Sequence, residues 1–274
     1  MDKIKKQPIK DLSLLDQTKM LECSICLDVV VPPIVQCEVG HIMCKKCVES
    51  VHLKHCPICR QPITNRRHVA FEQLLESVRG KLETECRFSA KGCKYKVAVS
   101  DKDNHERDCR HRTFRCEGKI FADWTCDWTG EYSELENHFK TAHKSNATMQ
   151  YTTKASIKVN FNHEYKDLQL ISFFNGQAYF YYKHFVDKNN EKLYWTIQYV
   201  GLQSNAVHYF YEFEIANGPI RKIKVTEICY NDTKICKEIF EEEKCVVVPF
   251  KAAKSYLNEN GELAFRFRIT KIKH

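Results

Sequence analysis

Cysteine and histidine side chains recur at regular spacing in the first half of the 274-residue chain. Eight of them form one dense run: Cys23-x2-Cys26-x10-Cys37-x3-His41-x2-Cys44-x2-Cys47-x8-Cys56-x2-Cys59. Thiolate and imidazole groups are ligands that zinc prefers, and a Cys-x2-Cys turn supplies two of them from one tight loop. A structural zinc site takes four such ligands, so this run can complete two sites. The spacing by itself permits either sequential or interleaved pairing of the ligand pairs.

A second group of eight ligands follows in two blocks that share an eleven-residue gap. The blocks read Cys86-x6-Cys93-x11-His105-x3-Cys109 and Cys116-x9-Cys126-x11-His138-x4-His143. The repeat predicts two further sites and therefore four Zn²⁺ ions in all. A structural zinc ion can contribute about 10–16 kcal/mol to folding, enough to order modules too small for a core of their own. DNA-reading fingers have a shorter gap between their cysteines, so we expect these modules to bind protein and not nucleic acid.

The ligand order of the first run resembles the RING finger. The resemblance implies that Ile25, Pro57 and Ile58 flank a shallow apolar groove for a ubiquitin-conjugating enzyme. It also implies that Arg60 bridges this enzyme and its ubiquitin, a role suited to the two-pronged guanidinium. The alternatives are that Ile25 only packs in the core and that Arg60 is only a solvated surface charge. A third alternative is a two-zinc knuckle without ligase activity. Interleaved pairing, also implied by the resemblance, gives Cys23, Cys26, Cys44 and Cys47 to one ion and Cys37, His41, Cys56 and Cys59 to the other.

The RING-like run followed by the paired blocks resembles the seven in absentia family of ubiquitin ligases. Residues 196–218 (TIQYVGLQSNAVHYFYEFEIANG) and 244–269 (KCVVVPFKAAKSYLNENGELAFRFRI) resemble the TRAF-like substrate-binding domain of that family. The resemblance covers residues 20–271. Two features depart from the family: the gap between Cys47 and Cys56 is longer, and a tryptophan expected near Leu168 is absent, which leaves the degron consensus open.

The residues after Gln150 have their own β-rich pattern and hold 23 of the 32 aromatic residues. Short alternating runs separated by turn sequences such as Asn260-Gly261 predict an antiparallel β-sandwich. A short helix is expected at residues 250–257. The predicted strands cover residues 177–186, 192–200, 207–216, 222–230, 245–250 and 262–270.

The fold class that follows is multidomain, with a small α+β RING, two zinc fingers of the seven in absentia type and an all-β TRAF-like sandwich. Apolar spacing predicts a helix over residues 66–82. The expected order is a disordered tail (1–19), the RING (20–62), a linker helix (63–83), the double zinc finger (84–146) and the sandwich (147–274).

The formal net charge is +8, but the excess is shared by both halves of the chain. There are 25 basic and 21 acidic residues up to Gln150, and 18 and 14 after it. The even spread indicates a solvated surface and not a nucleic-acid footprint. The charged start MDKIKKQPIK is unlike a signal segment, so we expect the 15 cysteines to meet a reducing compartment. No stretch has membrane-spanning character. We therefore expect a cytoplasmic protein, with a nuclear location left open.

Cys229, Cys236 and Cys245 lie in the β-rich half, outside the zinc motifs. A nucleophilic thiol needs basic neighbours that lower its pKa, and the local sequence shows none. We interpret them as inert strand cysteines, so no catalytic residue is predicted on this chain. His52 and His55 are interpreted as surface or packing residues because the eight-ligand set is already complete.

The hypothesis is a RING-type E3 ubiquitin-protein ligase with a conjugating enzyme, ubiquitin and protein substrates as partners. The family resemblance implies short extended degrons that add to a sheet edge, homodimerisation through the sandwich and proteasomal degradation of the substrate. Candidates for the degron groove are Ile157, Val159, Leu168 and Leu170, with a plain core role as the alternative. The competing hypothesis is a TRAF-like zinc adaptor that binds partners without transferring ubiquitin.

Overall fold

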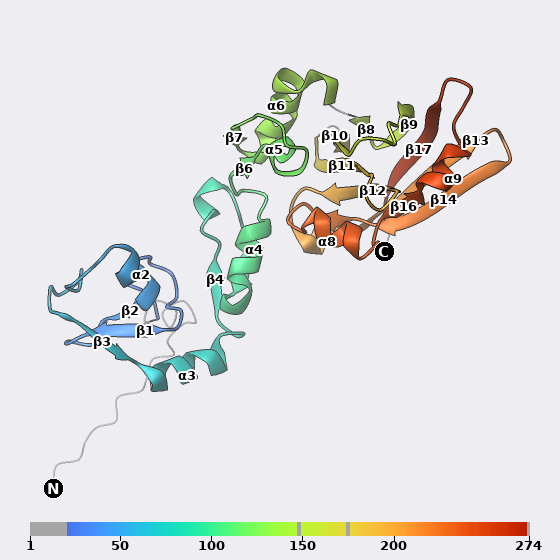
Figure 1. The fold of residues 1–274 in the computed structure, drawn as a ribbon. Coiled ribbons are helices and arrows are strands. Elements are labelled where there is room, and N and C mark those ends of the chain that lie inside the picture. Colours follow the sequence, from blue (N-terminus) through green and yellow to red (C-terminus); the bar gives the residue numbers. More distant parts are fainter. Residues whose placement is uncertain (1–20, 147–148, 174–175, 273–274) are drawn as a thin grey trace, which may run out of the picture. The chain divides into compact units, whose positions relative to one another are not determined.

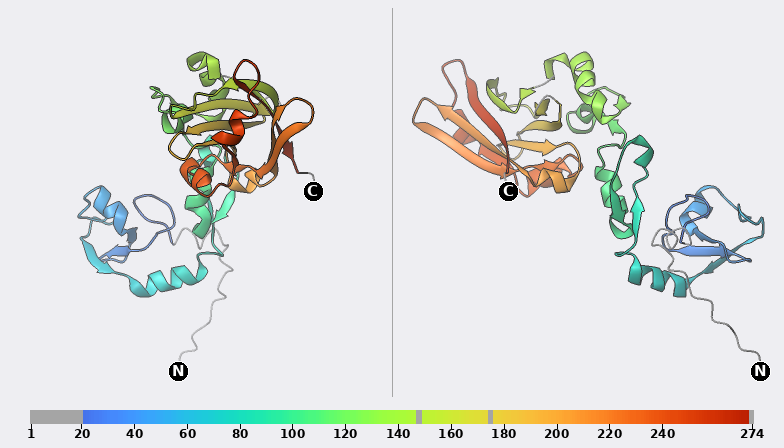
Figure 2. Two further views of the ribbon diagram at one scale, coloured as in Figure 1. Left: turned by 45° about the vertical axis from the view of Figure 1, so that its right-hand side comes forward. Right: turned by 180° about the vertical axis from the view of Figure 1, so that it is seen from behind.

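A computed structural model describes residues 21–146, 149–173 and 176–272. The predicted tail, residues 1–19, lies outside this part of the chain. Two compact units, residues 1–105 and 106–274, divide within helix α4 (Lys102–Asp108). Figure 1 labels most of their elements, and Figure 2 gives two further views. No helix in the described ranges is long and apolar enough to cross a membrane.

The first ligand run folds around a small antiparallel sheet with the strand order β2-β1-β3. Its register pairs Ile34 with Cys44, and Gln36 with Thr64. Gly40 turns the chain between β1 and β2 with a φ of 105°, a conformation that glycine adopts without a Cβ clash. The elements are β1 (Ile34–Cys37), β2 (Ile42–Cys44), α2 (Lys45–Ser50) and β3 (Ile63–Arg67).

Helix α3 (Val69–Val78) packs against this sheet. The prediction of a helix over residues 66–82 was wrong at its start, because residues up to Arg67 pair with β1 as part of β3. Glu72 fixes the helix in place. Its carboxylate accepts a hydrogen bond from the Ile34 N–H at 2.7 Å and forms an ion pair with Arg67 at 2.5 Å. The helix is therefore part of the RING core and not only a linker.

Each block of the second ligand group combines a two-stranded antiparallel sheet with a helix that follows it. A capping box of Glu131 and Glu134 begins the helical segment that carries His138. The first block contains β4 (Glu83–Glu85), η1 (Ser89–Lys91), β5 (Lys96–Ala98), η2 (Val99–Asp101) and α4. The second contains β6 (Phe114–Arg115), α5 (Glu117–Phe121), β7 (Thr129–Gly130), η3 (Tyr132–Glu134), α6 (Leu135–Ala142) and η4 (Lys144–Asn146).

The C-terminal half is a two-sheet sandwich, as predicted. One sheet has the order β15-β12-β11-β10-β8, with β16 also paired to β12, and the other has the order β14-β13-β17-β9. Its strands are β8 (Met149–Gln150), β9 (Thr152–Lys158), β10 (Tyr165–Phe173), β11 (Ala178–Asp187), β12 (Lys192–Tyr199), β13 (Tyr209–Asn217), β14 (Arg221–Ile228), β15 (Tyr230–Asn231), β16 (Val246–Pro249) and β17 (Glu262–Lys271). Its helices are α7 (Gln203–Ala206), α8 (Cys236–Glu241) and α9 (Phe250–Lys254).

The larger sheet is buried on both faces. On its inner face Phe180, Tyr182 and Trp195 pack against the smaller sheet. On its outer face Tyr179 and Tyr181 join an apolar cluster with side chains of α5, α6 and α8. Two buried faces explain why β11 reads as an almost unbroken apolar and aromatic run instead of alternating. The second zinc finger is thus packed on the sandwich as part of one folded unit.

Candidate functional site

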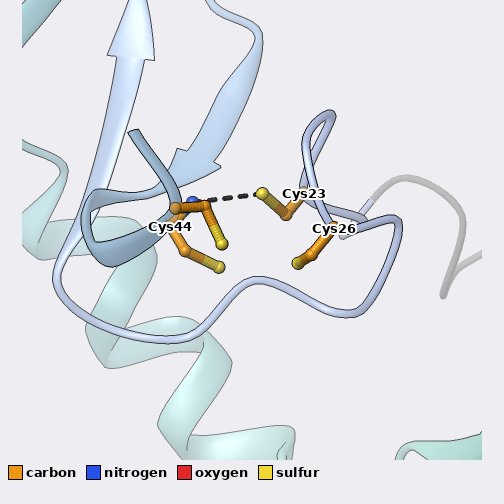
Figure 3. A group of neighbouring side chains, drawn as sticks. Cys23, Cys26 and Cys44 are labelled. Carbon is orange, nitrogen blue, oxygen red and sulfur yellow. Dashed lines mark hydrogen bonds between the residues drawn. The ribbon is translucent and has the colours of Figure 1, made fainter. Parts of the chain in front are cut away.

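The first RING centre brings four cysteine sulfurs within 4.8 Å of one another: Cys23, Cys26, Cys44 and Cys47. Figure 3 shows the side chains of Cys23, Cys26 and Cys44 pointing toward a common point. The Cys44 N–H donates to the sulfur of Cys23 at 3.4 Å, and the Val31 N–H donates to the sulfur of Cys44 at 3.2 Å. Such bonds favour the thiolate, which is the form that binds zinc.

The second RING centre gathers Cys37, His41, Cys56 and Cys59 within the same 4.8 Å limit. The sulfur of Cys37 lies 3.4 Å from Nδ1 of His41 and 3.6 Å from the sulfur of Cys59. Burial raises the pKa of Cys37, but hydrogen bonds from His41, Val39 and Cys59 together outweigh this effect and lower the pKa to about 6. The RING ligands are thus grouped in the interleaved order, so each ion would be held by ligands from segments that are distant in sequence.

The distances between the ligand atoms of each cluster fit tetrahedral zinc coordination. With Zn–S distances of about 2.3 Å and Zn–N distances of about 2.0 Å, a tetrahedron places neighbouring ligand atoms about 3.3–3.8 Å apart. The fingers show similar distances. Sulfur and Nε2 are 3.4 Å apart both for Cys93 with His105 and for Cys116 with His143. The third cluster consists of Cys86, Cys93, His105 and Cys109, and the fourth of Cys116, Cys126, His138 and His143.

Two tryptophans frame the imidazoles of the fourth cluster. Trp128 stacks on His138 with ring centroids 4.2 Å apart and an interplanar angle of 4°, and Trp124 lies 4.4 Å from His143. Burial lowers the pKa of both histidines, and the neighbouring His143 lowers that of His138 further. Both rings are therefore held in the neutral form that binds zinc. This role of the tryptophans was not predicted from the sequence, although both lie two residues from Cys126.

The first and last Cys-x2-Cys turns of the RING have matching backbones. The Leu27 N–H donates to the Cys23 carbonyl at 2.8 Å, and the Arg60 N–H donates to the Cys56 carbonyl at 2.8 Å. Leu27 and Arg60 have φ values of 62° and 61°, a left-handed conformation that is uncommon for residues with a side chain. The two zinc turns thus hold Leu27 and Arg60 in equivalent positions.

Three family models match this chain in order. They are the RING finger of E3 ubiquitin-protein ligase sina/sinah over residues 23–59, the Sina zinc finger over residues 77–157 and the Sina TRAF-like domain over residues 171–268. The chain belongs to the Sina family. The family resemblance seen in the sequence and the four zinc sites expected from it are confirmed.

Curated relatives carry ligase names. "E3 ubiquitin-protein ligase sina" of Schistosoma mansoni is 26% identical over 96% of this chain and 68% of its own length. The protein of that name from Drosophila melanogaster is 25% identical over 93% of this chain and 79% of its own length. "Probable E3 ubiquitin-protein ligase sinah" of Drosophila melanogaster is 32% identical over 53% of this chain and 39% of its own length. A Sina RING in such a family is consistent with a ubiquitin transferase.

The residues expected to contact a conjugating enzyme lie on the two matching zinc turns of this Sina RING. Pro57 and Arg60 are exposed and Ile58 is 61% exposed, whereas Ile25 is half-buried against the RING core. Leu27, which was not among the predicted contact residues, is 72% exposed on the first turn. The sequence signal for it was its position directly after the second cysteine, which matches that of Arg60.

The four groove candidates of the Sina sandwich divide into two pairs. Leu168 and Leu170 are fully buried on the face of β10 that packs against the second zinc finger, so they do not line an open groove in this structure. Their burial agrees with the alternative that they are core residues and not groove residues. Ile157 and Val159 are half-buried and line a cavity of about 480 Å³ beside β9, β10 and β11.

The three cysteines outside the zinc clusters lie in apolar or crowded places. Burial raises the pKa of Cys229 and raises that of Cys245 to about 12. Burial also raises the pKa of Cys236, against the effect of the neighbouring Lys183 ammonium. Raised pKa values oppose thiolate formation, so the structure offers no activated nucleophile at these positions.

Proposed function

We propose that this Sina-family protein is a RING-type E3 ubiquitin-protein ligase that recruits a ubiquitin-conjugating enzyme through its RING. The observation that carries the proposal is the pair of matching zinc turns. The last turn holds Ile58 and Arg60 exposed, and the first turn holds Leu27 exposed, on a scaffold fixed by two metal centres. Ile25 and Pro57 complete the proposed contact surface. Zinc supplies only the rigid framework for it.

The proposed mechanism needs no nucleophile on this chain. The ubiquitin thioester belongs to the conjugating enzyme, and the RING holds that enzyme against its exposed apolar residues. Arg60 can donate from both prongs of its guanidinium to carbonyl groups of the enzyme and of ubiquitin. Holding the thioester in an attack-ready position lowers the entropic cost of the transfer to a lysine.

The sandwich is the proposed substrate-binding domain. Family membership and the half-buried Ile157 and Val159 support a site for short extended degrons. We also propose homodimerisation through the sandwich and proteasomal degradation of the substrate. Twelve of the 15 cysteines lie in the zinc clusters, which need reduced sulfur, and this supports a reducing compartment such as the cytoplasm or the nucleus.

Autoubiquitination in vitro tests this proposal against the adaptor alternative. The assay contains the zinc-loaded chain, activating enzyme, ubiquitin, ATP and a panel of conjugating enzymes. We expect activity that falls at least about tenfold in Ile25→Ala, Ile58→Ala and Arg60→Ala. Leu74→Ala is the matched control, because this side chain on α3 is also exposed, at 59%, but lies outside the zinc turns. Wild-type rates in both Ile25→Ala and Arg60→Ala would reject the ligase mechanism, and inactivity with every conjugating enzyme would favour an adaptor.

A further inference from the structure

The first zinc turn of the RING, from Cys23 to Asp28, and the last, from Cys56 to Gln61, close in the same way. The Cys23 N–H donates to the Asp28 carbonyl at 2.7 Å, and the Cys56 N–H donates to the Gln61 carbonyl at 2.9 Å. Asp28 and Gln61 each directly follow the residue with the left-handed backbone. The two turns therefore share their backbone contacts and differ in what the side chains of Asp28 and Gln61 contact.

The side chain of Asp28 is held from outside the RING. It forms an ion pair with the ammonium of Lys102, the first residue of α4 in the first zinc finger. The side chain of Lys102 is 11% exposed and that of Asp28 is 45% exposed. Water and salt screen such a partly covered pair less than a pair at the open surface. Gln61, at the matching place on the last turn, is exposed.

Apolar contacts fix the first zinc finger against the RING. Leu82, just before β4, and Val99, just after β5, are both 5% exposed and belong to the core cluster that contains Leu75 of α3 and the RING sheet. The Val99 N–H donates to the Leu82 carbonyl at 2.8 Å, so both ends of the β4–β5 hairpin enter this core together. A cavity of about 410 Å³ separates the hairpin from the first zinc turn, and Leu27 and Lys102 line it. The finger thus gives Lys102 a fixed place beside the turn.

We propose that Lys102 is a positioning residue for ubiquitin transfer, which acts through Asp28 to hold the first zinc turn in the shape that presents Leu27 to the conjugating enzyme. The left-handed backbone of Leu27 is unfavourable for a residue with a side chain and persists when surrounding contacts fix it. A turn that is already ordered spares the cost of ordering it when the enzyme binds. This role rests on the proposed ligase function and makes the first zinc finger part of it.

Hydrogen exchange in the zinc-loaded full chain tests the positioning step without ubiquitin transfer. In Lys102→Met we expect the Leu27 amide, which donates to Cys23, to exchange at least about fivefold faster than in wild type, because the first turn opens more often. The Arg60 amide makes the matching bond in the last turn and should exchange as in wild type. Lys102→Arg keeps the charge and should leave both rates unchanged. Equal Leu27 rates in wild type and Lys102→Met would overturn the proposal.

Ubiquitin transfer supplies a second readout. Discharge of a ubiquitin-charged conjugating enzyme to free lysine is followed at increasing concentrations of the chain. In Lys102→Met we expect the half-saturating concentration to rise about fivefold and the rate at saturation to stay within about twofold, because lost preorganisation weakens binding and not the chemical step. The charge swap D28K/K102D should return the half-saturating concentration to within about twofold of wild type. Glu76→Gln breaks the ion pair with Arg79 on α3, outside the zinc turns, and should match wild type.

A double-mutant cycle shows whether Lys102 acts through the first turn. Leu27→Ala alone should raise the half-saturating concentration about fivefold, and adding Lys102→Met should raise it by less than about twofold more. Effects that simply multiply would overturn the proposal, because Lys102 would then act by another route. A wild-type chain that does not accelerate the discharge rejects the proposed ligase function, whereas unchanged Leu27 exchange in an active chain rejects the positioning role alone.

Discussion

The ammonium of Lys183 lies 2.5 Å from the carboxylate of Glu117, and the two residues are only 2% and 7% exposed. Lys183 belongs to β11 of the sandwich, and Glu117 directly follows the zinc ligand Cys116 at the start of α5. Burial works to lower the pKa of Lys183, but the neighbouring Cys236 and Glu117 outweigh it and leave the pKa raised. This buried ion pair ties the second zinc finger to the sandwich.

Breaking the pair from one side should destabilise the protein. Lys183→Met leaves the Glu117 carboxylate buried without its cation, so we expect the free energy of unfolding to fall by about 3 kcal/mol. The double variant Lys183→Met/Glu117→Gln removes both charges and should regain most of this loss. Urea unfolding of the zinc-loaded proteins measures both changes. A double variant no more stable than Lys183→Met would show that the unpaired charge is not the cause.

His184 should make the sandwich sensitive to acid. Its ring stacks on Trp195 at 4.5 Å, and burial lowers its pKa from 6.5 to about 4. Because the pKa of His184 is lower in the folded than in the unfolded chain, the unfolded chain binds a proton more readily as the pH falls. The stability that neutral His184 contributes is therefore complete above pH 6.5 and is lost as the pH falls toward 4. Between pH 7 and pH 5 this single group should cost about 2 kcal/mol of unfolding free energy.

The variant His184→Phe isolates this effect, because phenylalanine keeps an aromatic ring against Trp195 but cannot be protonated. We expect wild type to lose about 2 kcal/mol more than the variant between pH 7 and pH 5, measured by urea unfolding. Both proteins keep all the zinc ligands, so acid release of metal affects them alike. Equal acid losses in the two proteins would contradict the prediction.

Gly118 is required by the packing of Trp124. A Cβ atom built at Gly118 would lie 1.8 Å from Cε3 and 2.4 Å from Cδ2 of the indole, so alanine forces the ring out of its place beside His143. We expect Gly118→Ala to lower the free energy of unfolding by about 2 kcal/mol and to alter tryptophan fluorescence. Gly80→Ala is the matched control, since a Cβ there meets no atom within 4 Å. Equal stability of the two variants would rule out this packing constraint.

The sequence predicts the parts of this protein that depend on local spacing. Zinc ligands repeat at fixed intervals, and strands such as β17 alternate in their own residues, so both are readable without a structure. The burial of Leu168 and Leu170 could not be read from the sequence, because their face of β10 is covered by α6, an arrangement set by packing between distant segments. The Lys183–Glu117 ion pair could not be predicted from the sequence either, because its two residues come from distant segments.

The RING model makes its most direct prediction for a single-turnover reaction. A conjugating enzyme already charged with ubiquitin is mixed with free lysine, with and without the zinc-loaded chain, and loss of the thioester is followed in time. We predict that the chain accelerates this discharge, that Arg60→Ala removes most of the acceleration, and that Leu74→Ala retains it. A chain that holds four zinc ions yet leaves the discharge rate unchanged across a panel of conjugating enzymes would contradict the account.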